Sequence, residues 1–299
     1  MTNQPRVSIG IPVYNGENYL AEALDSLLRQ TYLDFEILIS DNASTDRTAE
    51  ICRDYAARDG RIRYVRQDRN IGAGPNHNRV LELSQSPYFK WAAHDDLYAP
   101  TYLEKCVAIL DRDPDVVLAH ADGPLIDAGG KPLSFDIFRQ CYTDCHGKRY
   151  AREPVDIAQS DIPSARFDDV LHRIVWCTAM YGLIRRDATN KVTLMRSYYG
   201  SDKVFLAEMA LLGKFHHVRE PLFMKRCHAA MSAQMTAKQR LAFMDTAAPK
   251  AFPYLELFKG YTRAALRTGS LDLLQRMQCV ASVARKTVRA RYWRASEEG

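Results

Sequence analysis

The sequence lacks any long apolar run. Nowhere among its 299 residues is there an uninterrupted stretch of the roughly 18 apolar residues that a membrane-spanning helix needs. The N-terminal residues 1–6 have no apolar segment behind a basic start, so we expect no secretory signal. Internal repeats and low-complexity tracts are absent as well. These absences predict a protein that is made and kept in the cytoplasm.

The chain also lacks a large net charge and an even number of cysteines. A net charge of +5 is modest for this length and gives no concentrated basic face, so we expect no nucleic-acid partner. Seven cysteines at irregular spacing predict reduced thiols, since a disulfide framework uses an even number. Cys141, Cys145 and His146 form one local cluster, but a structural zinc site would need a fourth ligand and usually has tighter spacing.

Apolar residues make up 46% of the chain, which is enough for a substantial core. Strand-length apolar runs at 7–13, 35–40, 62–65, 88–93 and 116–120 alternate with helical periodicity at 19–28, 46–55, 75–83 and 100–113. This alternation predicts βαβ units, and hence a three-layer α/β/α sandwich with a mostly parallel central sheet.

The pattern is less regular further along the chain. Residues 129–162 read as an excursion over the active-site side. A helix at 167–174, a strand at 179–184, a helix starting at 201 and a strand at 215–225 follow. Beyond residue 231 the pattern is entirely helical, which predicts a C-terminal helical extension.

Polar residues follow three of the predicted strands. Asp95 and Asp96 follow the strand at 88–93, Asp41 ends the strand at 35–40, and the first strand leads into residues 14–17. Ligands of open parallel sheets bind outside the carboxyl ends of the strands, so these ends predict one shared crevice. Two adjacent carboxylates suit Mg²⁺ or Mn²⁺, and a metal-bound nucleotide is the implied ligand. The alternative is that the acidic pair caps the following helix through its dipole.

Residues 7–16, 40–46 and 94–96 together resemble the family-2 glycosyltransferases of the GT-A fold, and the resemblance covers residues 5 to about 230. It implies inverting transfer of a sugar from a nucleotide diphosphate sugar, helped by Mg²⁺ or Mn²⁺. It also implies a GT-A catalytic domain at 1–230, with a nucleotide-sugar half to about 120, an acceptor half at 121–230, and an extension at 231–299.

The resemblance assigns residues to the donor site. Asp96 matches the metal-binding position and Asp95 the position that meets the ribose. Asp41 matches the position that accepts a ring N–H of the base, which admits uracil, thymine or guanine; the alternative is a turn-forming Asp. The first nucleotide-contacting loop is matched by three residues, Pro12, Tyr14 and Glu17. Tyr14 is open to a second interpretation, as plain packing.

Further matches lie along the chain. Residues 70–79 resemble a loop near the diphosphate, which implies nucleotide-binding roles for Asn76 and Arg79, although Arg79 also fits an exposed helix surface. Asp202, at a predicted helix start, matches the catalytic base; the alternative is a helix cap. Residues 226–232 resemble a segment near the metal and diphosphate. This implies that His228 completes the metal shell and Arg226 binds phosphate, unless both are exposed loop residues.

The chain departs from the family pattern at two positions. Ala93 replaces the first Asp of an Asp-x-Asp-Asp run, where His94 could act as a donor instead, and Ser201 replaces the usual Glu before the base. These departures motivate one alternative function, a non-catalytic nucleotide-sugar-binding or scaffold protein. A sugar-phosphate nucleotidyltransferase is the other, but the first strand is not followed by the Gly-rich basic loop it would need.

The C-terminal region carries apolar positions at helical spacing with a basic run at 285–294. This pattern suits a helix lying on an anionic membrane surface on the inner face of the membrane, or packing on a second subunit as a homodimer. Transmembrane helices and a Gln-x-x-Arg-Trp motif, which processive synthases of the family carry, are absent. The resemblance therefore implies transfer of a single sugar to a glycan or lipid-linked acceptor in cell-surface polysaccharide or glycolipid biosynthesis.

Overall fold

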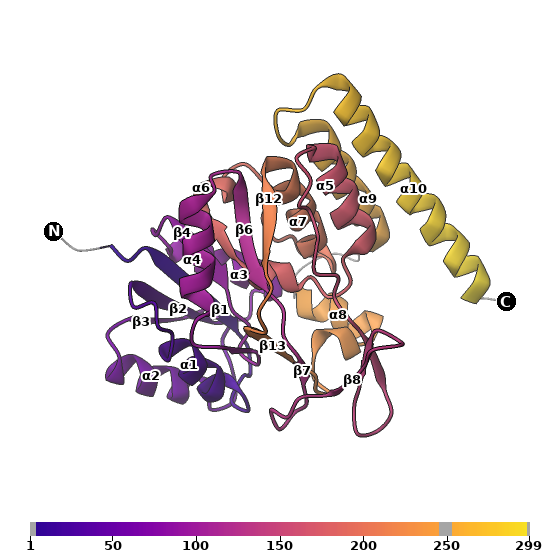
Figure 1. Cartoon of the computed structure of the whole chain (residues 1–299). Coiled ribbons are helices and arrows are strands. Elements are labelled where there is room, and N and C mark those ends of the chain that lie inside the picture. The colour runs from indigo at the N-terminus through magenta and orange to yellow at the C-terminus, as the bar shows by residue number, and fades with distance from the viewer. Residues whose placement is uncertain (1–3, 245–252, 298–299) are drawn as a thin grey trace.

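The computed structural model describes residues 4–244 and 253–297. A seven-stranded sheet forms its centre, with helices on both faces (Figure 1). In spatial order the strands are β12 (Lys214–Val218), β6 (Val116–Ala121), β11 (Leu183–Arg185), β4 (Tyr88–Trp91), β1 (Val7–Val13), β2 (Phe35–Asp41) and β3 (Ile62–Arg66). The strands run parallel except β11, which is antiparallel to both of its neighbours. The predicted three-layer α/β sandwich is confirmed.

Two hydrophobic clusters lie on opposite faces of this sheet. One involves α1 (Leu20–Leu28), α2 (Thr48–Arg58) and α4 (Tyr102–Arg112), and the other involves α3 (Ala73–Leu83), α5 (Pro163–Arg173) and α7 (Ser201–Leu212). Apolar residues of β1 that alternate along the strand fill the first cluster, as expected from the period of two. In the second, Trp91 of β4 packs edge-on against Phe205 of α7, with ring centroids 5.3 Å apart.

Gly10 of β1 lets α3 approach the sheet closely. A Cβ atom at this position would lie 2.6 Å from the ring of Phe89 and 2.7 Å from a methyl carbon of Val80. A residue without a Cβ is therefore required where α3 packs on β1. This close packing holds the first turn of α3 beside the carboxyl edge of the sheet.

Two predicted strands differ from the structure. The strand expected at 179–184 begins as a 3₁₀ turn, η1 (Thr178–Tyr181), because Cys177 takes a left-handed conformation with φ of 57° and redirects the chain; β11 and the short helix α6 (Arg186–Thr189) follow. The strand expected at 215–225 is broken, since Pro221 has no N–H to continue a ladder. Its second part, β13 (Phe223–Arg226), pairs with β5 (Leu97–Tyr98) and β7 (Leu125–Ile126) in a separate small sheet.

The excursion after β7 contains a third sheet. Its antiparallel strands are β8 (Ser134–Asp136), β9 (Cys141–Thr143) and β10 (Arg149–Ala151). Tyr150 and Leu133 are buried against Leu125, Cys227 and Met231, so the excursion has a small core of its own next to β13.

The C-terminal part is helical, as expected. It contains η2 (Ser232–Gln234), α8 (Ala237–Met244), α9 (Pro253–Arg267) and α10 (Leu273–Glu297). In the structure α9 packs on α7 and α10 packs on α5 (Figure 1). Side chains from residue 289 onward lie outside the described part of the chain, and so does most of the predicted basic surface at 285–294. Among the described helices, none has the length and hydrophobicity needed to span a bilayer. The domain boundary at residue 230 stays a prediction.

Candidate functional site

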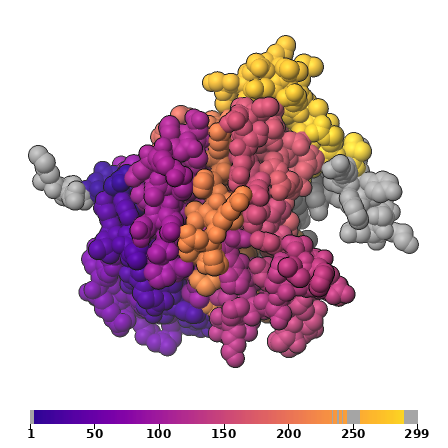
Figure 2. All heavy atoms as spheres, viewed as in Figure 1, coloured from indigo at the N-terminus to yellow at the C-terminus, as the bar shows by residue number. Residues whose placement is uncertain are grey.

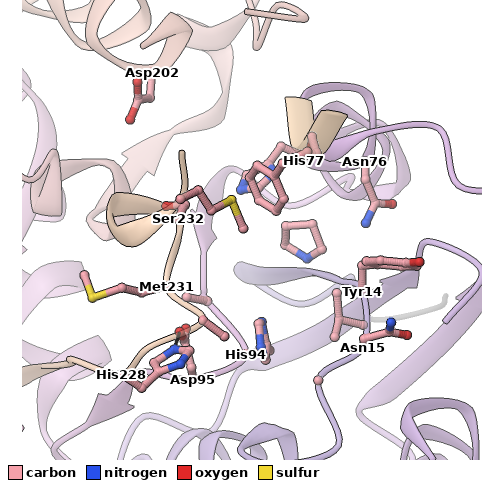
Figure 3. A pocket seen from close by; sticks show the side chains of 18 of the residues that line it. Tyr14, Asn15, Asn76, His77, His94, Asp95, Asp202, His228, Met231 and Ser232 are labelled. Atoms are coloured by element: carbon pink, nitrogen blue, oxygen red, sulfur yellow. Dashed lines mark hydrogen bonds and ion pairs between the residues drawn. The ribbon is translucent and has the colours of Figure 1, made fainter. Parts of the chain in front are cut away.

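A cavity of about 1040 Å³ lies at the carboxyl ends of β1, β2 and β4, where the sequence predicts a shared crevice. Its walls come from residues 12–16, the start of α3, residues 93–95, the start of α7, and residues 225–232 (Figure 3). Asp95 and Asp202 both line it, and Figure 3 shows them on different sides of the cavity. Segments more than a hundred residues apart in the sequence therefore share one site.

Asp95 and His228 form a pair at one wall of the cavity. Nε2 of His228 lies 2.8 Å from Oδ2 of Asp95, and the His228 ring packs at 4.9 Å from the ring of Tyr19. Burial alone would raise the pKa of Asp95. The hydrogen bond from His228 and the nearby charges of His94 and Lys225 outweigh burial and hold this pKa well below its ordinary value. Asp95 is therefore an anion at neutral pH.

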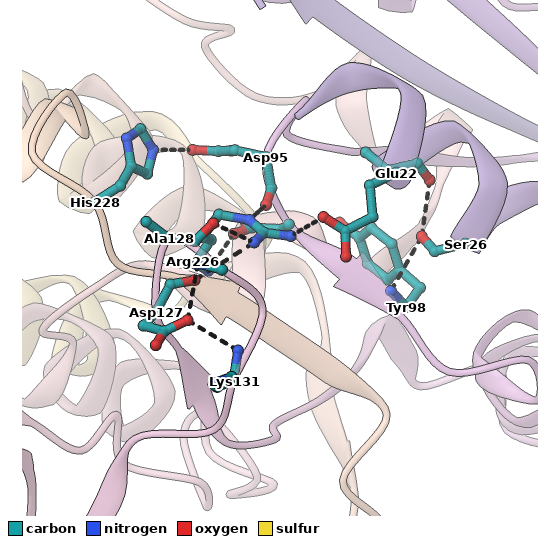
Figure 4. A network of polar contacts seen from close by, with 12 residues as sticks. Glu22, Ser26, Asp95, Tyr98, Asp127, Ala128, Lys131, Arg226 and His228 are labelled. Atoms are coloured by element: carbon teal, nitrogen blue, oxygen red, sulfur yellow. Dashed lines mark hydrogen bonds and ion pairs between the residues drawn. The ribbon is translucent and has the colours of Figure 1, made fainter. Parts of the chain in front are cut away.

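Arg226 supports this wall from behind and does not line the cavity. Its guanidinium donates to the backbone oxygen of Asp95 at 2.8 Å and to Glu22 at 2.6 Å, and it also reaches the carbonyl oxygens of Asp127 and Ala128 (Figure 4). The residue is only 1% exposed. The prediction that Arg226 binds the diphosphate is corrected by this geometry, because its donors are used within the protein.

Asp96 also points away from the cavity. Oδ1 accepts the backbone N–H of Arg226 at 2.9 Å, the residue is 0% exposed, and Oδ2 has no hydrogen-bond partner among the described residues. Nζ of Lys225 lies 4.0 Å from Oδ2. Burial raises the pKa of Asp96 above its ordinary value, and the charge of Lys225 opposes this. Asp96, the predicted metal ligand, therefore does not line the cavity in this structure, whereas Asp95, the predicted ribose contact, does; both roles stay predictions.

Lys225 is the cation that β13 presents to the cavity. Burial lowers its pKa, but the carboxylates of Asp96 and Asp95 more than compensate and raise the pKa of Lys225 above its ordinary value. Neighbouring residues of a strand point to opposite sides, so Lys225 faces the cavity where Arg226 faces the protein. The sequence shows Lys225 as a second basic residue beside Arg226. It does not show which of the two side chains faces the cavity.

Asp95 and His228 carry donor types that bind Mg²⁺ or Mn²⁺, a carboxylate oxygen and an imidazole nitrogen, and in this structure they bond to each other. Within residues 4–244 and 253–297 no group of three or more His, Cys, Asp or Glu side chains is placed to hold a metal. Mg²⁺ is commonly held by one or two carboxylates and completes its shell with water and phosphate, so Asp95 and His228 are the residues that would hold it here. The cluster of Cys141, Cys145 and His146 likewise gives no metal site in the described part of the chain.

Asp202 is placed by the start of α7. Gly200, with φ of 91°, turns the chain into this helix, and Oδ1 of Asp202 accepts the N–H of Lys203 at 2.9 Å. Gly200 is the N-cap residue, and Asp202 lies in the first turn with its carboxylate on an N-terminal amide, so the helix-cap interpretation of Asp202 stays an alternative. Burial and the charge of Asp202 raise the pKa of the neighbouring Cys177 thiol, so Cys177 stays neutral. Asp202 is thus the acidic group on this wall.

The predicted nucleotide residues separate into two groups. Pro12, Tyr14 and Asn76 line the cavity, with Tyr14 41% exposed and the Asn76 amide bonded to Ser40. Two others do not line it. Glu17 accepts the N–H of Arg47 at 3.0 Å, and Arg79 pairs with Glu82 at 3.3 Å on the exposed face of α3.

Asp41 is fully buried beneath the cavity. Its Oδ1 accepts the N–H of Ser44 at 2.8 Å, and its Oδ2 accepts the hydroxyl of Tyr64 at 2.8 Å and the guanidinium of Arg66 at 3.1 Å. The carboxylate does not line the cavity as the protein stands, because these donors occupy both oxygens.

His94, His77 and Tyr181 line the cavity too. His94 packs tightly on Gly16, where a Cβ atom would lie 2.9 Å from its ring. His77 and Tyr181 were not singled out from the sequence.

Comparison with known proteins gives a consistent result. Residues 8–151 match the family model described as glycosyl transferase family 2. The chain is similar to an uncharacterized glycosyltransferase of Rickettsia typhi, with 37% identity over 158 residues that cover 52% of this chain and 46% of the relative. It is also similar to the glycosyltransferase GlyG of Streptococcus pneumoniae, with 30% identity over 115 residues that cover 38% of each chain. The chain thus spans less than half of these relatives.

Two solved structures share the fold. The S. aureus TarS fragment 1–349 in complex with UDP superposes with a TM-score of 0.64 at 15% identity, covering 93% of this chain and 70% of that one. The mannosyltransferase PcManGT from Pyrobaculum calidifontis, in complex with GDP-Man and Mn²⁺, gives a TM-score of 0.55 at 15% identity, covering 97% and 76%. At this identity the likeness establishes the GT-A architecture and leaves the chemistry to the site.

Proposed function

The chain belongs to the family-2 glycosyltransferases of the GT-A fold, and we propose that it transfers a single sugar from a nucleotide diphosphate sugar to a hydroxyl, with inversion. One observation carries this proposal. The same cavity holds a carboxylate, Asp202, on one side and the Asp95–His228 pair with Lys225 on another (Figure 3). In-line displacement needs this separation, because the attacking and leaving oxygens lie on opposite sides of the anomeric carbon.

Asp202 is the proposed general base. It would accept the proton of the acceptor hydroxyl as that oxygen attacks. Its Oδ1 is held by the N–H of Lys203, which fixes the carboxylate at the first turn of α7. Ser201, where the family usually has Glu, is buried and bonds to the carbonyl of Arg196, so it supports the turn and does not compete for the proton.

Asp95, His228 and Lys225 form the proposed diphosphate wall. A bound Mg²⁺ or Mn²⁺ would supply charge neutralisation for the leaving diphosphate, and Asp95 and His228 would hold it. Lys225 donates to a phosphate oxygen, because its ammonium lies at the cavity with an ion pair to Asp96 at 4.0 Å and a contact over the Tyr181 ring at 5.7 Å, and neither is a hydrogen bond. It takes the role that the sequence suggested for Arg226.

The donor is proposed to be UDP-, dTDP- or GDP-linked. Complexes of TarS with UDP-GlcNAc and of PcManGT with GDP-Man and Mn²⁺ support a nucleotide diphosphate sugar as the ligand class. Tyr14 can stack on the base, since its ring is at the cavity and partly exposed. Asp41 would reach a base N–H after its pair with Arg66 opens, so base recognition by Asp41 stays a prediction.

The acceptor is proposed to be a glycan or a lipid-linked sugar of cell-surface polysaccharide or glycolipid biosynthesis. Apolar side chains line the cavity near Asp202, among them Val175, Trp176 and Met180. A Trp face suits the apolar side of a sugar ring or a lipid chain. We place the protein in the cytoplasm, with the C-terminal helices as a peripheral contact to the inner membrane face or to a second copy. Leu273 and Met277 of α10 are 76% and 62% exposed, which supports either use.

A thermal-shift experiment tests the donor class. UDP, dTDP, GDP, ADP and CDP would each be added with and without Mn²⁺, because a ligand that binds only the folded state raises the melting temperature. We expect a Mn²⁺-dependent increase with one of the first three.

The Asp202→Asn variant then tests the chemistry. We expect it to keep the nucleotide-induced shift while losing donor hydrolysis and transfer. Wild-type protein that binds the nucleotide sugar but shows neither reaction would favour the non-catalytic alternative. Formation of a nucleotide sugar from a sugar phosphate would favour the nucleotidyltransferase.

A further inference from the structure

His77, near the start of α3, brings an imidazole ring to the cavity that the proposed function does not use. Two other α3 residues line the cavity beside it, and neither offers a free polar group. Ala73 has an apolar side chain, and the Asn76 amide is held by Ser40 through both its oxygen and its nitrogen. In Figure 3 His77 lies between Asn76 and Asp202. His77 is therefore the α3 side chain that can recognise a ligand there.

The hydrogen bond of this ring defines which nitrogen is available. Nδ1 lies 2.8 Å from the carbonyl oxygen of Ala73, and a carbonyl only accepts, so Nδ1 carries the proton. Burial lowers the pKa of His77, although the bond to Ala73 and the charge of Asp202 oppose this, and the ring is neutral at pH 7. A neutral imidazole has one N–H, so Nε2 holds a lone pair and can only accept. Nε2 has no hydrogen-bond partner among the described residues.

The position of His77 relative to Asp202 is fixed by contacts of α3. The indole N–H of Trp91 donates to the backbone carbonyl of His77 at 2.9 Å. The next residue, Asn78, exchanges two hydrogen bonds with the backbone of Met195, at 2.9 and 3.0 Å. Met195 lies in the segment that leads into α7 and Asp202. A recognition group gains precision when such contacts hold it in place.

α3 and α7 belong to two parts of the chain that pack against each other. In Figure 2 the indigo and purple atoms of the early residues lie directly against the rose and orange atoms of the later ones. The proposed diphosphate wall, with Asp95 and His228, and the proposed base, Asp202, line the same cavity. In-line attack places the transferred sugar between that wall and the base. His77 lines the cavity near Asp202, so it lies where this sugar is expected.

We propose that Nε2 of His77 accepts a hydrogen bond from a hydroxyl group of the transferred sugar and thereby helps to select the donor. This inference rests on the proposed function. A sugar hydroxyl can donate, whereas the diphosphate oxygens carry no proton at neutral pH and cannot satisfy Nε2. A role as metal ligand is disfavoured, because within residues 4–244 and 253–297 His77 forms no metal-binding group with two other His, Cys, Asp or Glu side chains. A sugar that lacks the hydroxyl leaves Nε2 unpaired, which makes the contact selective.

The test compares each nucleotide with its sugar conjugate in the full chain. Calorimetric titration with Mn²⁺ gives Kd for UDP, dTDP and GDP, and for UDP-glucose, UDP-N-acetylglucosamine, dTDP-glucose and GDP-mannose. The Kd of a nucleotide sugar divided by the Kd of its nucleotide isolates the contribution of the sugar. In His77→Asn the amide N–H still donates to Ala73 from near the position of Nδ1, but nothing replaces Nε2. We expect this ratio to rise about fivefold for the nucleotide sugar that wild type binds best, the value of one neutral hydrogen bond, with the Kd of the nucleotide unchanged.

His77→Gln is the complementary variant. Its amide oxygen reaches the position of Nε2 while the bond to Ala73 is lost, so we expect it to recover part of the sugar contribution. His216→Asn, at a histidine outside the cavity, should leave the ratio unchanged.

The outcomes separate this inference from the proposed function. A wild-type ratio in His77→Asn would overturn the inference alone, since it would show that His77 only supports α3 through Nδ1. Equal losses for nucleotide and nucleotide sugar would overturn it as well, because Nε2 would then contact the nucleotide. Wild-type protein that binds none of the three nucleotides would contradict the proposed function, and this inference with it.

Discussion

Two acidic strand ends that look alike in the sequence differ in the structure. Asp41 ends β2 and Asp95 follows β4, each after a buried apolar run. Asp41 is 0% exposed and accepts hydrogen bonds from Ser44, Tyr64 and Arg66. Asp95 lines the cavity with His228 as its side-chain partner. One carboxylate thus stabilises the sheet edge, and the other is available to a ligand.

The difference arises from the segments that pack against each strand end. Tyr64 and Arg66 come from β3, which neighbours β2 in the sheet, so they reach Asp41. His228 and Lys225 come from the β13 segment, about 130 residues further along the chain, and lie beside Asp95 and Asp96. A polar strand end therefore becomes a binding group only where its neighbours leave an oxygen facing the cavity.

The largest effect is expected from Asp95→Ala. Removing the cavity-facing carboxylate should weaken Mn²⁺-dependent UDP binding by about a hundredfold or more, since even outer residues of metal sites cost 10–100-fold. Calorimetric titration with and without Mn²⁺ measures this. Asp68→Ala is the control, because Asp68 is an exposed carboxylate just after β3. Wild-type metal dependence in Asp95→Ala would mean that the metal ligand lies elsewhere and that Asp95 is not the ligand-binding carboxylate.

Asp41→Asn should act on stability instead. Its amide would turn an N–H toward one of the three donors that the carboxylate now accepts from. We expect a loss of about 2 to 3 kcal/mol in the free energy of unfolding, measured by urea denaturation. Uridine binding, measured well below the melting temperature of the variant, tests the alternative role in base recognition. Lost binding with unchanged stability would restore the role in base recognition that the sequence predicts.

The fold was predictable from the sequence where local pattern decides structure. The buried run of β1, the periodicity of α1 and the switch into α7 at Gly200 all appear as expected. The cavity was predictable too, because parallel strands bring their carboxyl ends to one edge. Asp202 and His228 line it, and their roles stay predictions.

The directions of single side chains were not predictable. Asp95 and Asp96 are adjacent, as are Lys225 and Arg226, and in each pair one member faces the cavity and the other faces the protein. Which member does so depends on the register of β13 with β5 and β7, and a one-residue shift exchanges the two faces.

A third polar residue near a strand end, His120 of β6, is also buried in the protein as Asp41 is. Its burial predicts an effect of pH on stability. Burial, with a contribution from the charge of His217, lowers the pKa of His120 to about 3; Asp122 and His216 are its other charged neighbours. At a pH between the two pKa values, His120 is therefore protonated in the unfolded chain and neutral in the folded chain. Stability should therefore fall as pH drops from about 6.5 toward 3, by about 2 kcal/mol at pH 5.

Urea denaturation of wild type and His120→Leu between pH 5 and 8 measures this contribution. The variant should lose this part of the pH dependence, and His146→Leu, at an exposed histidine of the excursion, should keep it. Identical pH profiles for wild type and His120→Leu would show that His120 does not carry the effect.

The smallest effect is expected at Lys225, and it separates a phosphate contact from a purely structural charge. Lys225→Met should weaken UDP binding by about tenfold, the value of one charge-assisted hydrogen bond to phosphate. Uridine binding should be unchanged, because the nucleoside carries no phosphate. Lys225→Arg should recover part of the loss, and Arg79→Met, which removes a cation paired with Glu82 outside the cavity, should cause none. Equal losses for UDP and uridine would mean that Lys225 only neutralises the buried Asp96, and the diphosphate wall would then consist of Asp95 and His228 without it.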